Sequence, residues 1–80
     1  MNGAEAQEVR HLLLGSHDQY RELANLHHDL DDRLHKLTEK HYLTTTEQVE
    51  EVTLKKRKLA LKDQMERIAT DWAREHPHSS

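Results

Sequence analysis

Residues 20–41 read YRELANLHHDLDDRLHKLTEKH, and the side chains that suit a helix–helix seam recur there at alternating intervals of three and four. This alternation is the heptad pattern of coiled-coil helices, so we predict a long helix from about residue 16 to residue 40. Ser16 with Gln19 three residues later is a capping box for its start, and Gly15 suits the end of a preceding helix. The seam consists of Tyr20, Leu23, His27, Leu30, Leu34, Leu37 and His41.

A short helix over about residues 5–14 precedes the seam, because Val9, Leu12 and Leu13 fall on one side of it. A helix of this length is not stable alone in water. We therefore expect it to pack on the rest of the chain.

A second long helix is expected over about residues 45–75. Thr44 with Glu47 three residues later is a capping box at its start, and the proline that follows the segment ends it. The turn between the long helices covers about residues 41–45, and residues 76–80 form a frayed tail. Two long helices joined by a short turn fold back antiparallel.

Length and composition restrict the fold further. The 80 residues suffice for one small domain, residues 1–80, whose core supplies little stability unless the protein oligomerises. The chain has no cysteine, which fits a reducing cytoplasm, and it contains no apolar run long enough to span a bilayer. We predict an all-α, cytoplasmic protein, an antiparallel two-helix hairpin resembling a coiled coil, with a short N-terminal helix, that forms oligomers.

The predicted last helix carries two apolar faces that one partner helix cannot cover. At 100° per residue, Val49, Val52 and Leu59 fall nearly opposite a second, longer stripe. We assign the first group to the contact within the hairpin and the longer stripe to a protein interface, with self-association as the simplest solution. The predicted interface residues are Leu54, Leu61, Met65, Ile68 and Trp72.

Charge is segregated along the chain. Residues 1–51 carry 11 acidic and 5 basic side chains, whereas residues 52–80 carry 4 acidic and 7 basic ones. If the hairpin turns near Leu43, residues whose numbers sum to about 86 lie side by side, which brings an acidic cluster opposite a basic run. The predicted intramolecular polar network comprises His27, Asp29, Asp31, Asp32, Lys55, Lys56, Lys58 and Asp63.

The basic run Lys55–Lys62 has an alternative interpretation as a nucleic-acid contact, since cations that neutralise phosphates release counterions. The net charge of −3, the lack of aromatic side chains for base stacking, and the spread of the cations around the helix all weigh against it. We therefore favour the internal match and keep nucleic-acid binding as the alternative function.

The chain offers little for catalysis or metal binding. It lacks a cysteine nucleophile and a glycine-rich phosphate loop, and a thin hairpin has no pocket that excludes water. No two of its eight histidines have the four-residue spacing of a helical zinc site, although protonation of the histidines could loosen a charge-paired assembly. We expect no enzyme activity, no cofactor, no metal and no small-molecule substrate.

Two motifs resemble those of the YdcH-like family, small bacterial proteins of unknown function. The first is His27-x-x-Leu30-Asp31-x-x-Leu34, preceded by Tyr20-x-x-Leu23. The second is Leu54-Lys55-Lys56-x-Lys58-Leu59-x-Leu61-Lys62-Asp63-x-Met65. The resemblance spans about Tyr20 to Ile68 and implies an α-helical hairpin with a short leading helix. It implies no catalytic residues.

Overall fold

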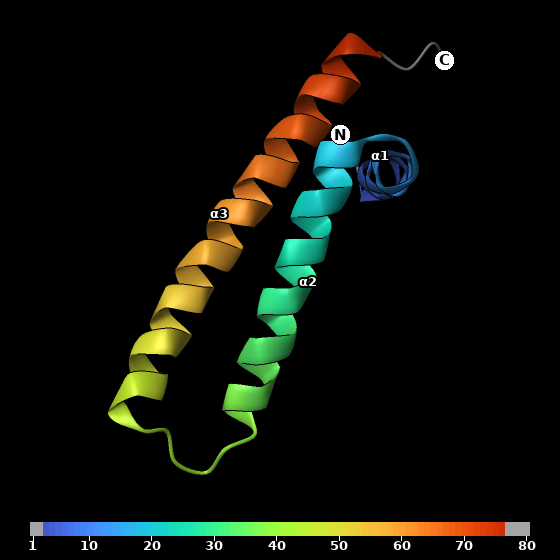
Figure 1. Ribbon diagram of the computed structural model, residues 1–80. Coiled ribbons are helices and arrows are strands. Elements are labelled where there is room, and N and C mark those ends of the chain that lie inside the picture. Colours follow the sequence, from blue (N-terminus) through green and yellow to red (C-terminus); the bar gives the residue numbers. More distant parts are fainter. Residues whose placement is uncertain (1–2, 77–80) are drawn as a thin grey trace.

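The computed structural model describes residues 3–76, and all of its regular elements are helices. Helix α1 spans Gly3–Ser16, α2 spans Asp18–Thr38 and α3 spans Thr45–Glu75. Figure 1 shows α2 and α3 side by side and running in opposite directions, while α1 is seen end-on beside the open end of the pair. The prediction of an all-α protein is confirmed.

The junction between α1 and α2 differs from the predicted one. Ser16 belongs to the last turn of α1, where its hydroxyl donates to the carbonyl of Leu12 at 2.8 Å. The N-cap of α2 is His17, which has extended backbone angles and whose Nδ1 accepts a hydrogen bond from the N–H of Tyr20 at 3.0 Å. The Ser16 capping box was therefore wrong, because the serine side chain is already used inside α1. Gly15 is helical with no positive φ and does not act as a left-handed cap.

The start of α3 confirms the second capping box. The N–H of Glu47 donates to Oγ1 of Thr44 at 3.1 Å, and the N–H of Thr44 donates to Oε1 of Glu47 at 3.0 Å. These reciprocal bonds satisfy two backbone donors at the helix terminus. Lys40, beyond the end of α2, also pairs with Glu47, so the same carboxylate ties the turn to the first turn of α3.

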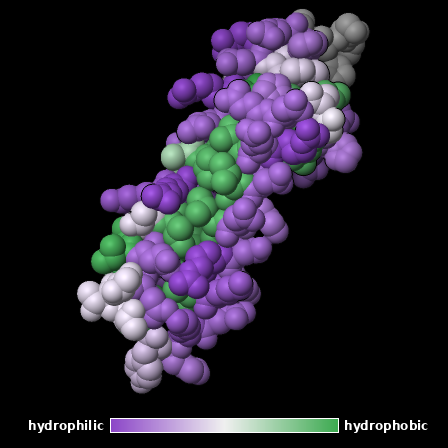
Figure 2. Space-filling model, viewed as in Figure 1, coloured by the Kyte–Doolittle hydropathy of each residue, from purple (hydrophilic) through white to green (hydrophobic). Residues whose placement is uncertain are grey.

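The main core cluster lies where the three helices meet. Leu13 of α1 is completely buried and forms a cluster with Tyr20 and Ala69, against which Val9, Met65, Ile68 and Trp72 pack. Farther along α2, Leu23, Leu34 and Leu37 are also buried. Figure 2 shows apolar side chains as a band along the molecule, bordered by hydrophilic ones, so the cover provided by three helices is incomplete.

The two apolar faces of α3 are reversed relative to the prediction. Three members of the predicted interface pack instead against the core cluster of this chain. They are Met65, Ile68 and Trp72. Leu54 and Leu61, the other two members of that stripe, are half-buried. Val49, Val52 and Leu59, which were expected inside the hairpin, are exposed. The physical reason is that the longer stripe buries more apolar area, and α1 supplies the extra cover that α2 alone cannot give.

No helix within residues 3–76 combines the length and the apolar character that crossing a membrane requires.

The turn makes the stability of this protein depend on pH. Hydrogen bonds from the Lys40 ammonium and from Thr44 lower the pKa of Glu47 from its ordinary value of 4.5 to about 2. Since the unfolded chain then binds more protons, this carboxylate contributes its full stability above about pH 4.5 and loses it as the pH falls towards 2.

We expect Glu47→Gln to lower the urea midpoint of unfolding at pH 6, and the difference from the wild type to shrink as the pH approaches 2. The neutral amide cannot bind the Lys40 ammonium as strongly as the carboxylate does. Urea titrations at a series of pH values measure the effect, with Glu22→Gln on the exposed side of α2 as the control. A Glu47→Gln curve that runs parallel to the wild-type curve would contradict this explanation.

Candidate functional site

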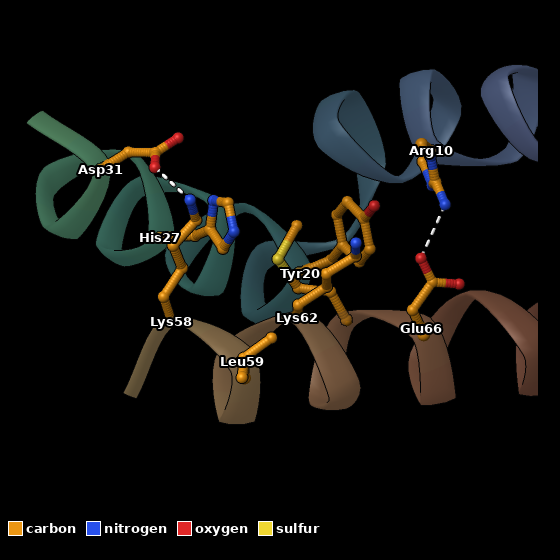
Figure 3. A pocket seen from close by; sticks show the side chains of 9 residues that line it. Arg10, Tyr20, His27, Asp31, Lys58, Leu59, Lys62 and Glu66 are labelled. Atoms are coloured by element: carbon orange, nitrogen blue, oxygen red, sulfur yellow. Dashed lines mark hydrogen bonds and ion pairs between the residues drawn. The ribbon is translucent and has the colours of Figure 1, made fainter. Parts of the chain in front are cut away.

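A groove runs along one side of the molecule, where α1, α2 and α3 approach one another (Figure 3). Its volume is about 490 Å³, and it is open to solvent along its length. The lining combines apolar and charged side chains from all three helices. It consists of Arg10, Tyr20, His27, Asp31, Lys58, Leu59, Lys62, Met65 and Glu66.

Two ion pairs between helices bracket this groove, as Figure 3 shows. At one end Asp31 of α2 pairs with Lys58 of α3, and at the other end Arg10 of α1 pairs with Glu66 of α3 at 2.6 Å. Tyr20 lies between them and is almost fully buried. Burial raises the pKa of the Tyr20 phenol, the Arg10 cation opposes this change, and Glu66 reinforces it. The phenol is thus held neutral and contributes packing.

The predicted polar network forms only in part. Lys58 hydrogen-bonds the Asp31 carboxylate and thereby lowers its pKa, and the positive charges of Lys58, His27 and His28 act in the same direction. This pair joins α2 to α3, although Asp31 was expected to lie beside Lys55.

The remaining members of the predicted network find other neighbours or none. Lys55 pairs within α3 with Glu51 at 3.4 Å, and Asp32 lies 3.5 Å from the imidazole of His28 within α2. Within residues 3–76, the structure gives no ion pair to Asp29, Lys56 or Asp63. Their side chains leave α2 and α3 in directions that do not face the other helix.

The basic run is therefore divided between paired and unpaired cations. Lys55 and Lys58 have carboxylate partners, whereas Lys56, Arg57 and Lys62 have no ion pair in the described part of the chain. At 100° per residue these three unpaired cations leave α3 in widely different directions. They do not form the continuous stripe that a phosphate backbone requires.

Sequence reasoning missed an exposed apolar strip on α3, which consists of Val49, Val52 and Leu59. Their exposed fractions are 62%, 52% and 61%. Spacings of three and seven residues place them on one face of the helix. The same spacings were visible in the sequence, but they were assigned to the contact with α2. The Arg10–Glu66 pair was also missed, since a contact between residues 56 positions apart leaves no local signal.

Within the described range 3–76, no group of three or more His, Asp or Glu side chains gathers closely enough to hold a metal ion. The full sequence contains no cysteine. Four charged groups of the groove form two ion pairs, Arg10 with Glu66 and Asp31 with Lys58, whereas Lys62 has no ion pair within the described residues.

One family model matches more than half of the chain. It carries the description "Protein of unknown function (DUF465)" and covers residues 21–69, which include most of α2, the turn and much of α3. No curated protein and no solved structure matches the chain.

We expect Lys58→Met to raise the pKa of Asp31 towards its ordinary value, because the substitution removes the hydrogen bond and the nearest positive charge. Carboxyl-carbon NMR titration of the variant and the wild type measures the change. Lys62→Met is the matched control, since Lys62 lines the same groove without pairing with Asp31. An equal change in the two variants would show that general charge, not the specific contact, sets this pKa.

Proposed function

This chain belongs to the DUF465, or YdcH-like, family of unknown function, and we propose that it is a helical protein–protein interaction module that associates with a second copy of itself. In the proposed dimer, α3 of one copy packs antiparallel on α3 of the other through the strip of Val49, Val52 and Leu59. The proposal assigns no catalytic activity and no cofactor.

The exposure of this strip is the observation that carries the proposal. Three large aliphatic side chains on one face of α3 are each more than half exposed, whereas the described part of the chain buries only six hydrophobic residues. Single exposed apolar residues are ordinary, but a row of them along one helix is typical of an interaction surface. Covering each such side chain contributes roughly 1 kcal/mol or more to association.

The charges around Leu59 favour a second copy of this chain as the partner that covers the strip. Lys56 and Asp63 flank Leu59 at −3 and +4 on the same face, and neither has an ion pair within residues 3–76. A two-fold axis close to Leu59 would set the two Leu59 side chains together. It would also place Lys56 of each copy near Asp63 of the other. Such self-complementarity is what a symmetric dimer interface requires.

Nucleic-acid binding remains the second candidate and has weaker support. Two of the five cations in the basic run are occupied by Glu51 and Asp31, and the other three leave α3 in different directions. Binding of duplex DNA at low salt, weakening by about one unit of log K per phosphate contact as salt rises, would support this alternative.

We expect Leu59→Glu to weaken self-association by at least about tenfold, because a buried, unpaired carboxylate would lie at the centre of the interface. Sedimentation velocity over a range of protein concentrations measures the association constant. Tyr42→Glu is the control, since Tyr42 is also an exposed apolar side chain but lies in the turn. A wild-type protein that stays monomeric at high concentration would overturn the proposal.

A charge swap tests the orientation of the two copies. Lys56→Glu and Asp63→Lys should each weaken association by about threefold to tenfold, since each creates like-charge contacts at both symmetric positions. The double variant should recover most of the lost affinity, and high salt should reduce all of these differences. Losses that simply add in the double variant would exclude the antiparallel arrangement.

A further inference from the structure

We propose that α1 is exchangeable between copies of this chain, so that α1 of a second copy can take the place of the chain's own α1. The surface that receives it, called here the α1 seat, is formed by Tyr20, Met65, Ile68, Ala69 and Trp72. The apolar residues of the α1 seat lie on a different face of α3 from the strip of Val49, Val52 and Leu59, although Leu59 lines the same groove as Arg10 and Glu66.

The α1 seat recognises α1 in the way that a groove recognises an amphipathic helix. Leu13 is fully buried against Tyr20 and Ala69, and Val9 packs one turn before it. Arg10 adds an ion pair to Glu66 at 2.6 Å. Residues spaced by four on one helix face, with a charged neighbour, are the usual anchors of such complexes. A second copy brings an identical α1, so every one of these contacts can form between chains.

The junction between α1 and α2 is nearly helical already. The N–H of His17 donates to the carbonyl of Leu13 at 2.8 Å, and the N–H of Arg21 donates to the carbonyl of His17 at 3.0 Å. Both bonds have the i to i−4 spacing of an α-helix. Only His17, with φ −120° and ψ 105°, departs from helical angles between Gly3 and Thr38. A rotation at this single residue joins α1 and α2 into one continuous helix.

Joining the helices removes one hydrogen bond and forms others. The bond from the Tyr20 N–H to Nδ1 of His17 is lost. In a continuous helix, the N–H groups of Asp18, Gln19 and Tyr20 acquire backbone carbonyls four residues earlier. Gly15 is already helical in the present structure, so the joined form requires no change of its backbone conformation.

The form in which α1 and α2 are one continuous helix exposes the apolar residues whose burial drives exchange. When α1 continues the direction of α2, it leaves its own α1 seat and carries Val9 and Leu13 into solvent. Reciprocal exchange with one other copy restores both buried sites and closes at a dimer, the usual outcome of domain swapping at a short hinge. Because α1 crosses the α2–α3 pair in the protomer (Figure 1), the two α2–α3 pairs of the exchanged dimer cross each other.

Mixed cross-linking detects the exchange directly, and the absence of native cysteine makes it specific. An isotopically heavy Arg10→Cys chain is refolded at high concentration with a light Glu66→Cys chain and treated with a short bismaleimide. Exchange predicts cross-linked species of mixed mass, because Arg10 of one copy then lies beside Glu66 of the other. A mixture of Arg10→Cys with Tyr42→Cys, at the far turn, gives the background from collisions. Mixed species no more abundant than this background would overturn the proposal.

Variants of the hinge provide a second measurement. His17→Ala removes the cap of the closed form, which shifts the equilibrium between the closed and the joined helix about fivefold towards the joined form. Because two hinges open in each dimer, we expect the association constant of the exchanged dimer to rise about 25-fold. His17→Asn keeps a capping acceptor and should leave dimerisation at or below the wild-type level. Size-exclusion chromatography of refolded samples measures both. Equal behaviour of the two variants would contradict the role of the hinge.

The same experiments in a Leu59→Glu background separate this exchange from the α3–α3 pairing. Mixed cross-links that persist when sedimentation shows the Leu59-dependent association to be lost would establish exchange on its own. If the mixed cross-links disappear together with that association, exchange depends on the α3 interface and the proposal of an independent exchange is wrong.

Discussion

Burial of Leu13 against Tyr20 and Ala69 is the contact on which the arrangement of this protein depends. Leu13 belongs to a helix too short to be stable alone, and it packs on the face of α3 that carries Met65, Ile68 and Trp72. With α1 in place, Met65, Ile68 and Trp72 acquire neighbours from a third helix. The strip of Val49, Val52 and Leu59 lies on another side of α3 and faces solvent. The proposed self-association uses this side of α3, which the packing within the chain leaves exposed.

Ion pairs contribute mainly to register and direction. Arg33 with Glu50, Asp31 with Lys58 and Arg10 with Glu66 link different helices along the length of the molecule. All are partly exposed, and pairs of this kind contribute between zero and about 1 kcal/mol each. Their value lies in their positions, since a parallel or shifted packing of α2 on α3 would separate these charges. The apolar contacts supply most of the stability, and the charges select one arrangement among several of similar apolar burial.

Sequence patterns predicted the features that depend on a few neighbouring residues. The heptad seam correctly marked Tyr20, Leu23, Leu34 and Leu37 as buried, and the Thr44 capping box is present as expected. The Ser16 cap failed at the same scale, because a serine hydroxyl can bond backward within a helix as well as forward to its start. His17 took the capping role through a ring nitrogen, which is an uncommon choice with no strong sequence signal.

What the sequence determined by itself was the all-α character, the heptad seam of α2, the cap of α3 and the family, because each depends on periodicity or motifs within short segments. Only the tertiary structure decided which apolar face of α3 is buried. It also decided that Asp31 meets Lys58 and that the charges of Lys56 and Asp63 stay unmatched within the described residues. The two faces of α3 are both plausible inside a two-helix pair. The structure packs the face with Met65, Ile68 and Trp72 against Leu13 of α1 and Tyr20 of α2, contacts between residues distant in sequence that no local pattern encodes.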